Sequence, residues 1–149
     1  AGIIRTKLVS GNLHISMVPA TLYTHALVKG YLIDPVTVGN PHAVVFVKNL
    51  ECVSEDMAKE IQESKNALGK LFFPCGVHLE FACVQNDGIH VRVFERGVGE
   101  TQSCGTGACA VALVSKFNKL CGNNVTIKMK GGDINVKLKK NVATMITNL

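Results

Sequence analysis

The sequence predicts an α+β fold in which an antiparallel or mixed β-sheet wraps around one central, buried helix. Most of the chain consists of short runs that alternate apolar and polar residues or are rich in β-branched residues, a pattern typical of strands. Residues 108–114 have no polar side chain, so a helix there would be apolar on every face and must be buried. From the length of 149 residues we expect residues 1–149 to form a single domain, which can bury about two-thirds of its unfolded surface.

The strands are predicted from alternation and from the turns between them. Ser10-Gly11-Asn12 indicates a first hairpin, Asn86-Asp87-Gly88 a second and Gly131-Gly132-Asp133 a third. Lysines in the third hairpin alternate with apolar residues, so we interpret them as a solvated face and not as a phosphate site. The expected strands comprise residues 3–9, 13–17, 36–39, 43–47, 79–84, 89–94, 127–130 and 134–138.

Two helices are expected. Ser54 can cap the first, which has a modest apolar stripe of Met57, Ile61 and Leu68 and should lie on the surface. The second should begin near Cys104 and run to about Leu120, where Cys121-Gly122-Asn123 provides a stop.

Composition excludes several classes of protein. Hydrophobic residues make up 47% and charged residues 18%, so the chain is not disordered. It has no apolar run of about 18 residues, and from its first residues we expect no signal peptide. A net charge of +5 without charge blocks or Trp gives little support for nucleic-acid binding. We therefore expect neither a membrane nor a nucleic-acid partner. Because the first residue is not Met, we expect a processed chain or one cut from a longer protein.

Six cysteines occur at positions 52, 75, 83, 104, 109 and 121. None forms a Cys-x-x-Cys pair, so a zinc site is not expected and no metal is assigned. Six cysteines without a secretion signal indicate a reducing compartment, and hence the cytoplasm. We expect five of them to be small buried core residues and Cys104 to differ.

Cys104 stands where a Gly-rich loop enters the buried helix. The helix N-terminus presents unpaired N–H groups and the positive end of the dipole, which favour a thiolate and should lower the pKa of Cys104. The same N–H groups can hold a substrate carboxylate. This placement suits nucleophilic attack or removal of a proton beside a carboxylate. The alternative is tight packing, with Cys104 an ordinary core residue.

Residues 95–109, Glu-Arg-Gly-Val-Gly-Glu-Thr-Gln-Ser-Cys-Gly-Thr-Gly-Ala-Cys, closely resemble the second signature of the diaminopimelate epimerase family. Residues 38–44 are similar to its Gly-Asn-Pro-His segment, and residues 73–81 to the stretch before the hairpin that leads into the signature. The resemblance covers nearly the whole chain but only one half of that enzyme. The Asn-Cys-Gly-Asn-Gly-like motif of the first half is absent, and the first residues look like the crossover into the second half.

The resemblance implies the C-terminal half of a two-domain epimerase, a sheet around a central helix that donates one of two cysteines. Its partner would be the missing N-terminal domain of the same protein, and a homodimer is possible. The implied reaction interconverts LL- and meso-diaminopimelate in lysine and peptidoglycan precursor synthesis. It uses no cofactor, pyridoxal phosphate included. One thiolate removes the α-proton of this small amino-acid substrate while a thiol on the opposite face returns one.

The resemblance also assigns roles. Cys104 would be the acid/base thiol, with Glu95 and His42 orienting and tuning it. The N–H groups of Gly105 and Thr106 would hold the reacting carboxylate. Asn40 and Arg96 would bind other polar groups of the substrate, with the Arg96 guanidinium forming a bidentate contact to the distal carboxylate.

His78 stands where the family usually has a substrate-binding Asn. A His can donate a hydrogen bond but differs in shape and charge, so we assign it to substrate binding while keeping an ordinary strand residue as the alternative. It favours a second hypothesis, a related racemase for another amino acid. The missing half favours a third, a binding module without catalysis. A hydrolase with a Cys nucleophile lacks an obvious His partner near Cys104 in the sequence.

Overall fold

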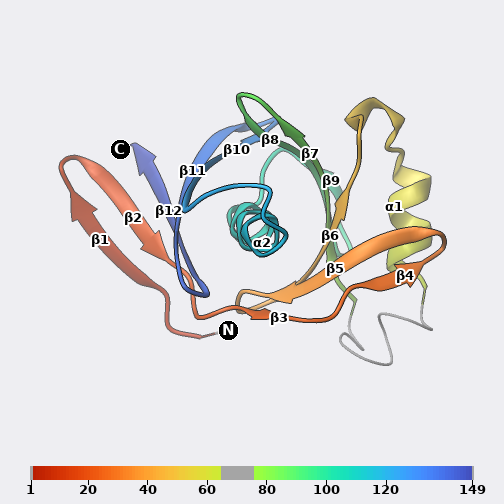
Figure 1. Ribbon diagram of the computed structural model, residues 1–149, viewed down its shortest axis with the longest axis horizontal. Helices are drawn as coiled ribbons and strands as arrows, with labels where there is room; N and C mark the ends of the chain where they lie inside the picture. Colours follow the sequence, from red (N-terminus) through yellow and green to blue (C-terminus); the bar gives the residue numbers. More distant parts are fainter. Residues whose placement is uncertain (1, 65–75, 149) are drawn as a thin grey trace.

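The computed structural model describes residues 2–64 and 76–148, in which a curled sheet surrounds the helix α2 (Gly105–Phe117). Figure 1 looks down this helix, with strands on most sides of it. Residues 107–115 of α2 are all buried. The predicted fold class and the predicted central helix are therefore confirmed.

The strands form one mixed sheet in the order β1-β2-β12-β11-β10-β8-β7-β6-β5-β3, with β4 beside β5 and β9 beside β8. The pairs β6–β7 and β8–β10 are parallel, and all other described pairs are antiparallel. The strands are β1 (Arg5–Val9), β2 (Asn12–Ser16), β3 (Thr21–Leu22), β4 (Ala26–Val28), β5 (Tyr31–Thr37), β6 (Pro41–Phe46), β7 (His78–Gln85), β8 (Gly88–Glu95), β9 (Gly99–Thr101), β10 (Asn124–Met129), β11 (Gly132–Lys139) and β12 (Val142–Asn148).

The three predicted hairpins are confirmed as β1–β2, β7–β8 and β10–β11. The sequence prediction omitted β3, β4, β9, β12 and most of β5. β5 contains the buried Pro35, a residue that argues against a strand in a sequence. β12 pairs with β11 across a tight turn and with β2 on its other side, and its burial has little regular alternation. In β5 and β12, pairing with neighbouring strands overrides weak local preference.

The helix α2 ends at Phe117, earlier than the predicted Leu120, because the backbone turns at Lys119 without a glycine. Lys119 has φ +61°, and the N–H groups of Lys119 and Leu120 donate to the carbonyls of Lys116 and Ser115. This pattern of bonds is the Schellman motif, which satisfies the last carbonyls of a helix. The segment Cys121-Gly122-Asn123 follows this stop and does not form it.

The helix α1 (Glu55–Gln62) packs on the outer face of the sheet (Figure 1). As predicted, the Ser54 hydroxyl caps it by accepting a hydrogen bond from the Met57 N–H at 3.2 Å. Ile61 is buried, while the predicted stripe residue Leu68 lies outside the described residues. A short 3-10 helix, Leu50–Cys52, precedes α1. In the described ranges, neither α1 nor α2 is long and apolar enough to cross a membrane.

Strand alternation divides the interior into two cores and fixes which residues face the helix. On β6 and β7, Val44 and Ala82 belong to the inner core around α2, whereas Ala43 and Phe81 belong to the outer core beneath α1. Because side chains alternate along a strand, the even-numbered residues His42, His78 and Glu80 share the inner side. Three ionisable side chains therefore face the helix.

One ion cluster fastens β9 to the sheet. The Arg92 guanidinium donates to both carboxylate oxygens of Glu100, at 2.8 and 2.9 Å, and Lys130 Nζ lies 2.7 Å from Glu100 Oε1. These cations, the Arg92 hydrogen bonds foremost, lower the pKa of Glu100 to about 2. The cluster ties together β8, β9 and the end of β10, which frame the loop that leads to Cys104.

We predict that Leu113→Ala lowers the free energy of unfolding by about 2–5 kcal/mol, because it leaves a cavity beside the central helix. Leu113 is 3% exposed. Phe117→Ala at the 71% exposed end of the same helix is the control and should change stability little. Urea unfolding followed by circular dichroism measures both; equal losses would contradict the central placement of α2.

We also predict that Glu100→Gln lowers stability by about 2 kcal/mol near neutral pH. The pKa of Glu100 falls from 4.5 in the unfolded chain to about 2 in the folded one. Its stabilising effect is therefore present above about pH 4.5 and disappears as the pH falls towards 2. Thermal unfolding of both proteins across this range should show curves that converge in acid. A constant difference at every pH would contradict the role of the charge.

Candidate active site

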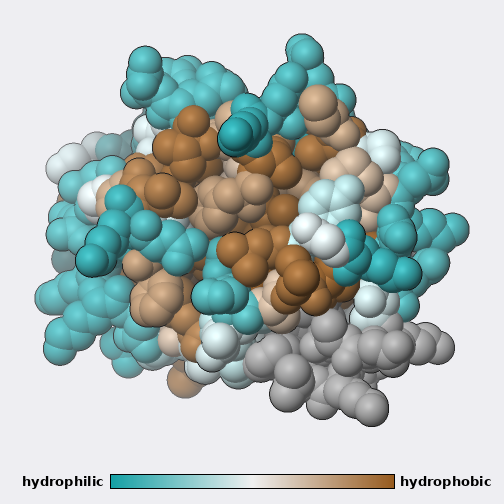
Figure 2. Space-filling model, turned by 45° about the vertical axis from the view of Figure 1, so that its right-hand side comes forward, coloured by the Kyte–Doolittle hydropathy of each residue, from teal (hydrophilic) through white to brown (hydrophobic). Residues whose placement is uncertain are grey.

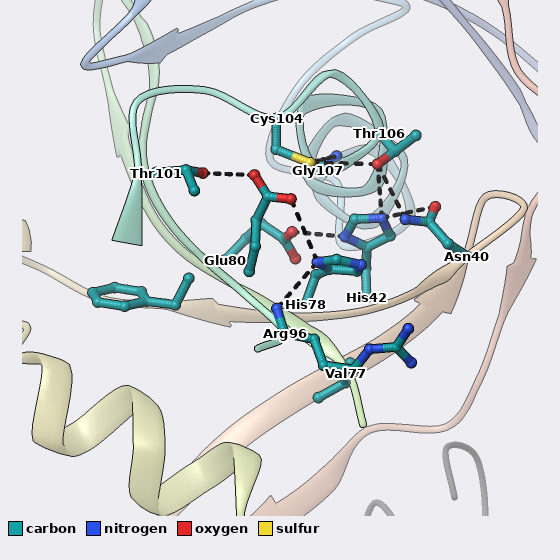
Figure 3. Close-up of polar contacts among 12 residues, drawn as sticks. Asn40, His42, Val77, His78, Glu80, Arg96, Thr101, Cys104, Thr106 and Gly107 are labelled. Carbon is teal, nitrogen blue, oxygen red and sulfur yellow. Dashed lines mark hydrogen bonds and ion pairs between the residues drawn. The ribbon is translucent and has the colours of Figure 1, made fainter. Parts of the chain in front are cut away.

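The predicted functional side chains, with the exception of Arg96, meet at the N-terminus of α2. His42 lies near the start of β6, and His78 begins the parallel strand β7, where the two are register partners. Glu95 ends β8, which runs antiparallel to β7, so His42, His78 and Glu95 lie at the same end of these three neighbouring strands. Figure 3 shows His42 and His78 below Cys104, the residue that caps the helix.

The Cys104 sulfur lies in the first turn of the helix and contacts two hydrogen-bonding groups. Its Sγ accepts from the Gly107 N–H at 3.4 Å and lies 3.4 Å from Thr106 Oγ1. The Cys104 N–H donates to Met129 Sδ at 3.4 Å. A side chain at position 107 would place Cβ only 2.8 Å from Glu80 Oε1 and 3.4 Å from this sulfur. Glycine is therefore required for the close approach of helix, thiol and carboxylate.

The lowered pKa predicted for Cys104 from the helix N-terminus is wrong for this chain. Burial raises the pKa of the thiol, and the carboxylates of Glu80 and Glu95 raise it further. The hydrogen bonds from Thr106 and Gly107 act in the opposite direction but do not outweigh burial. The N-terminal position is as predicted, but desolvation controls the ionisation of the sulfur.

His42 is fully buried and contacts polar groups through both ring nitrogens. Its Nδ1 lies 2.7 Å from Glu80 Oε1, and its Nε2 lies 3.1 Å from both Asn40 Oδ1 and Thr106 Oγ1. Asn40 Nδ2 donates to the same Thr106 oxygen at 3.4 Å. The predicted residues His42, Asn40, Thr106 and Cys104 therefore belong to one connected set of contacts.

Glu80 is the site residue that sequence reasoning missed. Its side chain is completely buried, and among the described residues its Oε2 has no hydrogen-bond partner. A signal was available, because Glu80 is the one charged residue of an otherwise apolar strand segment, residues 79–84. A carboxylate in such a run is expected to be paired when buried.

Glu95 and His78 form a second group beside the first. Glu95 Oε1 accepts from the Thr101 hydroxyl at 2.7 Å, and Glu95 Oε2 lies 3.9 Å from His78 Nδ1. Burial and, secondarily, the neighbouring His42 lower the pKa of His78. Its Nδ1 accepts a hydrogen bond from the Arg96 N–H at 3.4 Å, so in the neutral ring the proton resides on Nε2. His78 is thus able to donate towards a ligand, as the missing Asn would.

The two groups meet through the rings of His42 and His78, whose centroids are 5.1 Å apart. The Arg96 side chain points away from Cys104 (Figure 3) and lines a neighbouring pocket of about 500 Å³ between α1 and the turn after β8. The structure therefore brings the backbone of Arg96, but not its guanidinium, to the site. Gly105 and Thr106 form the first turn of α2, where backbone N–H groups have no acceptor within the helix.

The other cysteines differ in burial. Cys83 and Cys109 are buried as predicted, and burial raises the pKa of Cys109 to about 12. Cys121 is half-buried, and Cys75 lies outside the described residues. The expectation for Cys52 is wrong, because the residue is exposed at the end of a 3-10 helix. In residues 2–64 and 76–148 no group of three His, Cys, Asp or Glu side chains could hold a metal ion.

The model of the family described as diaminopimelate epimerase matches residues 35–148. This chain belongs to the diaminopimelate epimerase family. A diaminopimelate epimerase of Pelotomaculum thermopropionicum is 41% identical over 105 residues, which cover 70% of this chain and 36% of that protein. The enzyme of the same name from Leptospira biflexa is 35% identical over 120 residues, 80% of this chain and 41% of that one. The chain thus spans well under half the length of these relatives.

Solved structures show the same fold at lower identity. A probable proline racemase from Agrobacterium radiobacter superposes with a TM-score of 0.67 at 15% identity, covering 93% of this chain and 53% of that one. A predicted epimerase from Pseudomonas aeruginosa has a TM-score of 0.65 at 13% identity, with 97% and 58% covered. In each, the chain matches little more than half of the protein. The diaminopimelate epimerase-like domain fold is therefore confirmed.

We predict an order of alkylation among the cysteines. Exposed Cys52 should react first with iodoacetamide, Cys104 second, and buried Cys83 and Cys109 last. Because burial raises the pKa of Cys104 above 9.0, its rate should keep rising beyond pH 9. Mass mapping of peptides after brief treatment between about pH 7 and 10 checks this. If Cys104 reacts no faster than Cys109, its assignment as an acid/base thiol loses its physical basis.

Proposed function

We propose that the chain is the C-terminal half of a cofactor-independent epimerase that interconverts LL- and meso-diaminopimelate. The observation that carries this proposal is the position of Cys104. Its sulfur caps the helix of a family member, and it contacts a hydroxyl and an N–H group beside a buried His and two carboxylates. This arrangement suits a thiol that exchanges a proton with carbon.

The chemistry follows from the donors at the helix N-terminus. The N–H groups of Gly105 and Thr106 would hold the α-carboxylate of the substrate, as a helix N-terminus holds anions. The same dipole would stabilise the negative charge that develops when the α-proton leaves. The Cys104 thiolate takes this proton and becomes a thiol, while the electron pair of the C–H bond stays on the substrate. A second thiol on the opposite face then returns a proton to carbon.

The second thiol has no candidate among the described cysteines near Cys104. Cys109 is buried within α2, and its pKa of about 12 prevents it from exchanging protons near neutral pH. The other face of the carbon therefore requires a cysteine from another part of the protein. The N-terminal half, expected from the length of the relatives, would supply it. Closure of that half over Cys104 would also exclude water, as abstraction of a weakly acidic proton requires.

The remaining polar groups would bind the rest of the substrate. Asn40 and His78 present an amide and a ring N–H on the inner side, and Arg96 would turn its guanidinium towards the distal carboxylate when the site is complete. His78 in place of Asn supports one alternative, a racemase for a different amino acid. A carboxylate-binding module without catalysis is the other alternative.

The proposal includes a cytoplasmic location, pyridoxal-phosphate-independent lysine synthesis and a possible homodimer. The five described cysteines are all free thiols, which suits a reducing compartment.

Exchange of the α-proton of diaminopimelate in deuterated water, followed by NMR, tests the proposal. Because one thiol serves only one face, the purified 149 residues should give no detectable epimerisation. The longest natural protein that contains the chain should exchange the proton, and its Cys104→Ala variant should lose at least about 10³-fold in rate. Cys52→Ala is the control and should keep full activity. Rapid epimerisation by the 149 residues alone would refute the half-enzyme proposal, and activity on another amino acid only would favour the racemase.

A further inference from the structure

We propose that the Thr106 hydroxyl relays the proton of Cys104 to His42, and that Glu80 is the positioning residue that holds the resulting imidazolium. This inference rests on the proposed function, because it states how the thiolate of that reaction forms. Figure 3 shows the four side chains in sequence, from the sulfur through the hydroxyl and the ring to the buried carboxylate.

The relay follows first from the contacts of Thr106. Its Oγ1 lies 3.4 Å from Cys104 Sγ and 3.1 Å from His42 Nε2, whereas in the described residues no hydrogen bond joins the sulfur to the ring directly. A hydroxyl accepts and donates at the same time, so it can pass a proton between two neighbours. Thr106 is thus the group through which the thiol and the imidazole can exchange a proton.

Two proton arrangements fit the contacts of Thr106 with Cys104 and His42. In the first, the sulfur carries its proton and donates to Thr106, whose hydroxyl donates to the unprotonated Nε2 of His42. Nε2 and Asn40 Oδ1, 3.1 Å apart, are then both acceptors and form no hydrogen bond. In the second, both nitrogens of His42 carry protons: Nδ1 donates to Glu80 Oε1, and Nε2 donates to Asn40 Oδ1 and Thr106 Oγ1. Asn40 Nδ2 also donates to Thr106, so the hydroxyl proton is directed to Cys104 Sγ. The sulfur then accepts two hydrogen bonds, one from Thr106 and one from Gly107.

The conversion between the two arrangements is a balanced proton transfer. The S–H bond of Cys104 breaks and its electron pair remains on sulfur as the thiolate. The proton bonds to Thr106 Oγ1, while the original hydroxyl proton moves to His42 Nε2. Thr106 ends neutral, His42 gains one positive charge and Cys104 gains one negative charge, so the net charge of the site is unchanged.

Glu80 makes this charge separation possible inside the protein. A buried imidazolium needs a counter-charge, because burial strongly disfavours an unpaired ion. The Glu80 carboxylate is wholly buried and lies 2.7 Å from His42 Nδ1. Among the described residues its second oxygen has no partner, so His42 is the group that pairs it. The pair also fixes the ring so that Nε2, and not Nδ1, faces Thr106.

The charged groups around Cys104 allow this relay to be separated from simple repulsion. Glu80 and His78 face the sulfur from β7, His42 from β6 and Glu95 from β8. Both carboxylates raise the pKa of Cys104 by repulsion. Without a relay, removing either charge should favour the thiolate. With the relay, only Glu80 also supports the proton acceptor, so its removal should have the opposite effect.

The first test uses the 149-residue chain and measures the alkylation rate of Cys104 against pH by peptide mass mapping. Thr106→Val keeps the shape of the side chain but removes the hydroxyl, and we expect the midpoint of the profile to rise by about one pH unit and the rate at neutral pH to fall about tenfold. Thr106→Ser should restore the parent profile. Thr126→Val, on the far strand β10, is the matched control and should not change it. An unchanged midpoint in Thr106→Val would overturn the relay.

The second test compares Glu80→Gln with Glu95→Gln. The relay predicts that the midpoint rises in the first and falls in the second, whereas repulsion alone predicts a fall in both. Circular dichroism establishes whether each variant is folded, and if Glu80→Gln does not fold, the Thr106 variants alone decide. The readout does not depend on epimerisation. A complete protein that exchanges the α-proton while Thr106→Val keeps the parent profile overturns the relay only, and a shifted profile without exchange overturns the proposed function only.

Discussion

The position of one apolar helix controls every other feature of the site. Because α2 is buried along residues 107–115, its first turn is held against the inner side of β6 and β7. Beyond the end of the helix, no apolar helix side chains cover the inner face of β6 and β7, so polar groups there must pair with one another. His42 and Glu80 occupy this place, and their pairing lets two ionisable groups exist at zero exposure beside the helix end.

The central helix, the hairpins and the position of Cys104 were predictable because they depend on local patterns. The signals are local in the sequence: a run of seven apolar residues, a Ser cap and three Gly-containing turns each specify the structure of a few neighbouring residues. β5 and β12 were not predictable in this way. Pro35 is tolerated within a strand, and β12 pairs both with β2, more than a hundred positions away, and with β11 across a turn that contains no glycine.

The site shows the same division between local and long-range determinants. The family resemblance brought together His42, Asn40, Thr106 and Cys104, and the geometry joins them by hydrogen bonds. The family resemblance did not identify Glu80. Its role becomes visible only in the fold, where β7 directs this side chain towards α2 and His42. The direction of the pKa shift of Cys104 could not be predicted from the sequence. The helix N-terminus favours a thiolate and desolvation opposes it, and the extent of burial, which decides the direction, is known only from the structure.

The pairing of β2 with β12 has a consequence for synthesis on the ribosome. Ser16 and Thr144 are register partners whose hydroxyl oxygens lie 2.8 Å apart, so the first hairpin is held in the sheet by the last strand. During translation, β1 and β2 leave the exit tunnel long before their partner exists. The Ile15 side chain of β2, which packs against the inner core in the folded chain, lacks the neighbouring strand β12 until residues 142–148 have been made. Closure of the sheet at β2 therefore waits for residues 142–148, and a nascent chain that lacks them offers an open strand edge to chaperones.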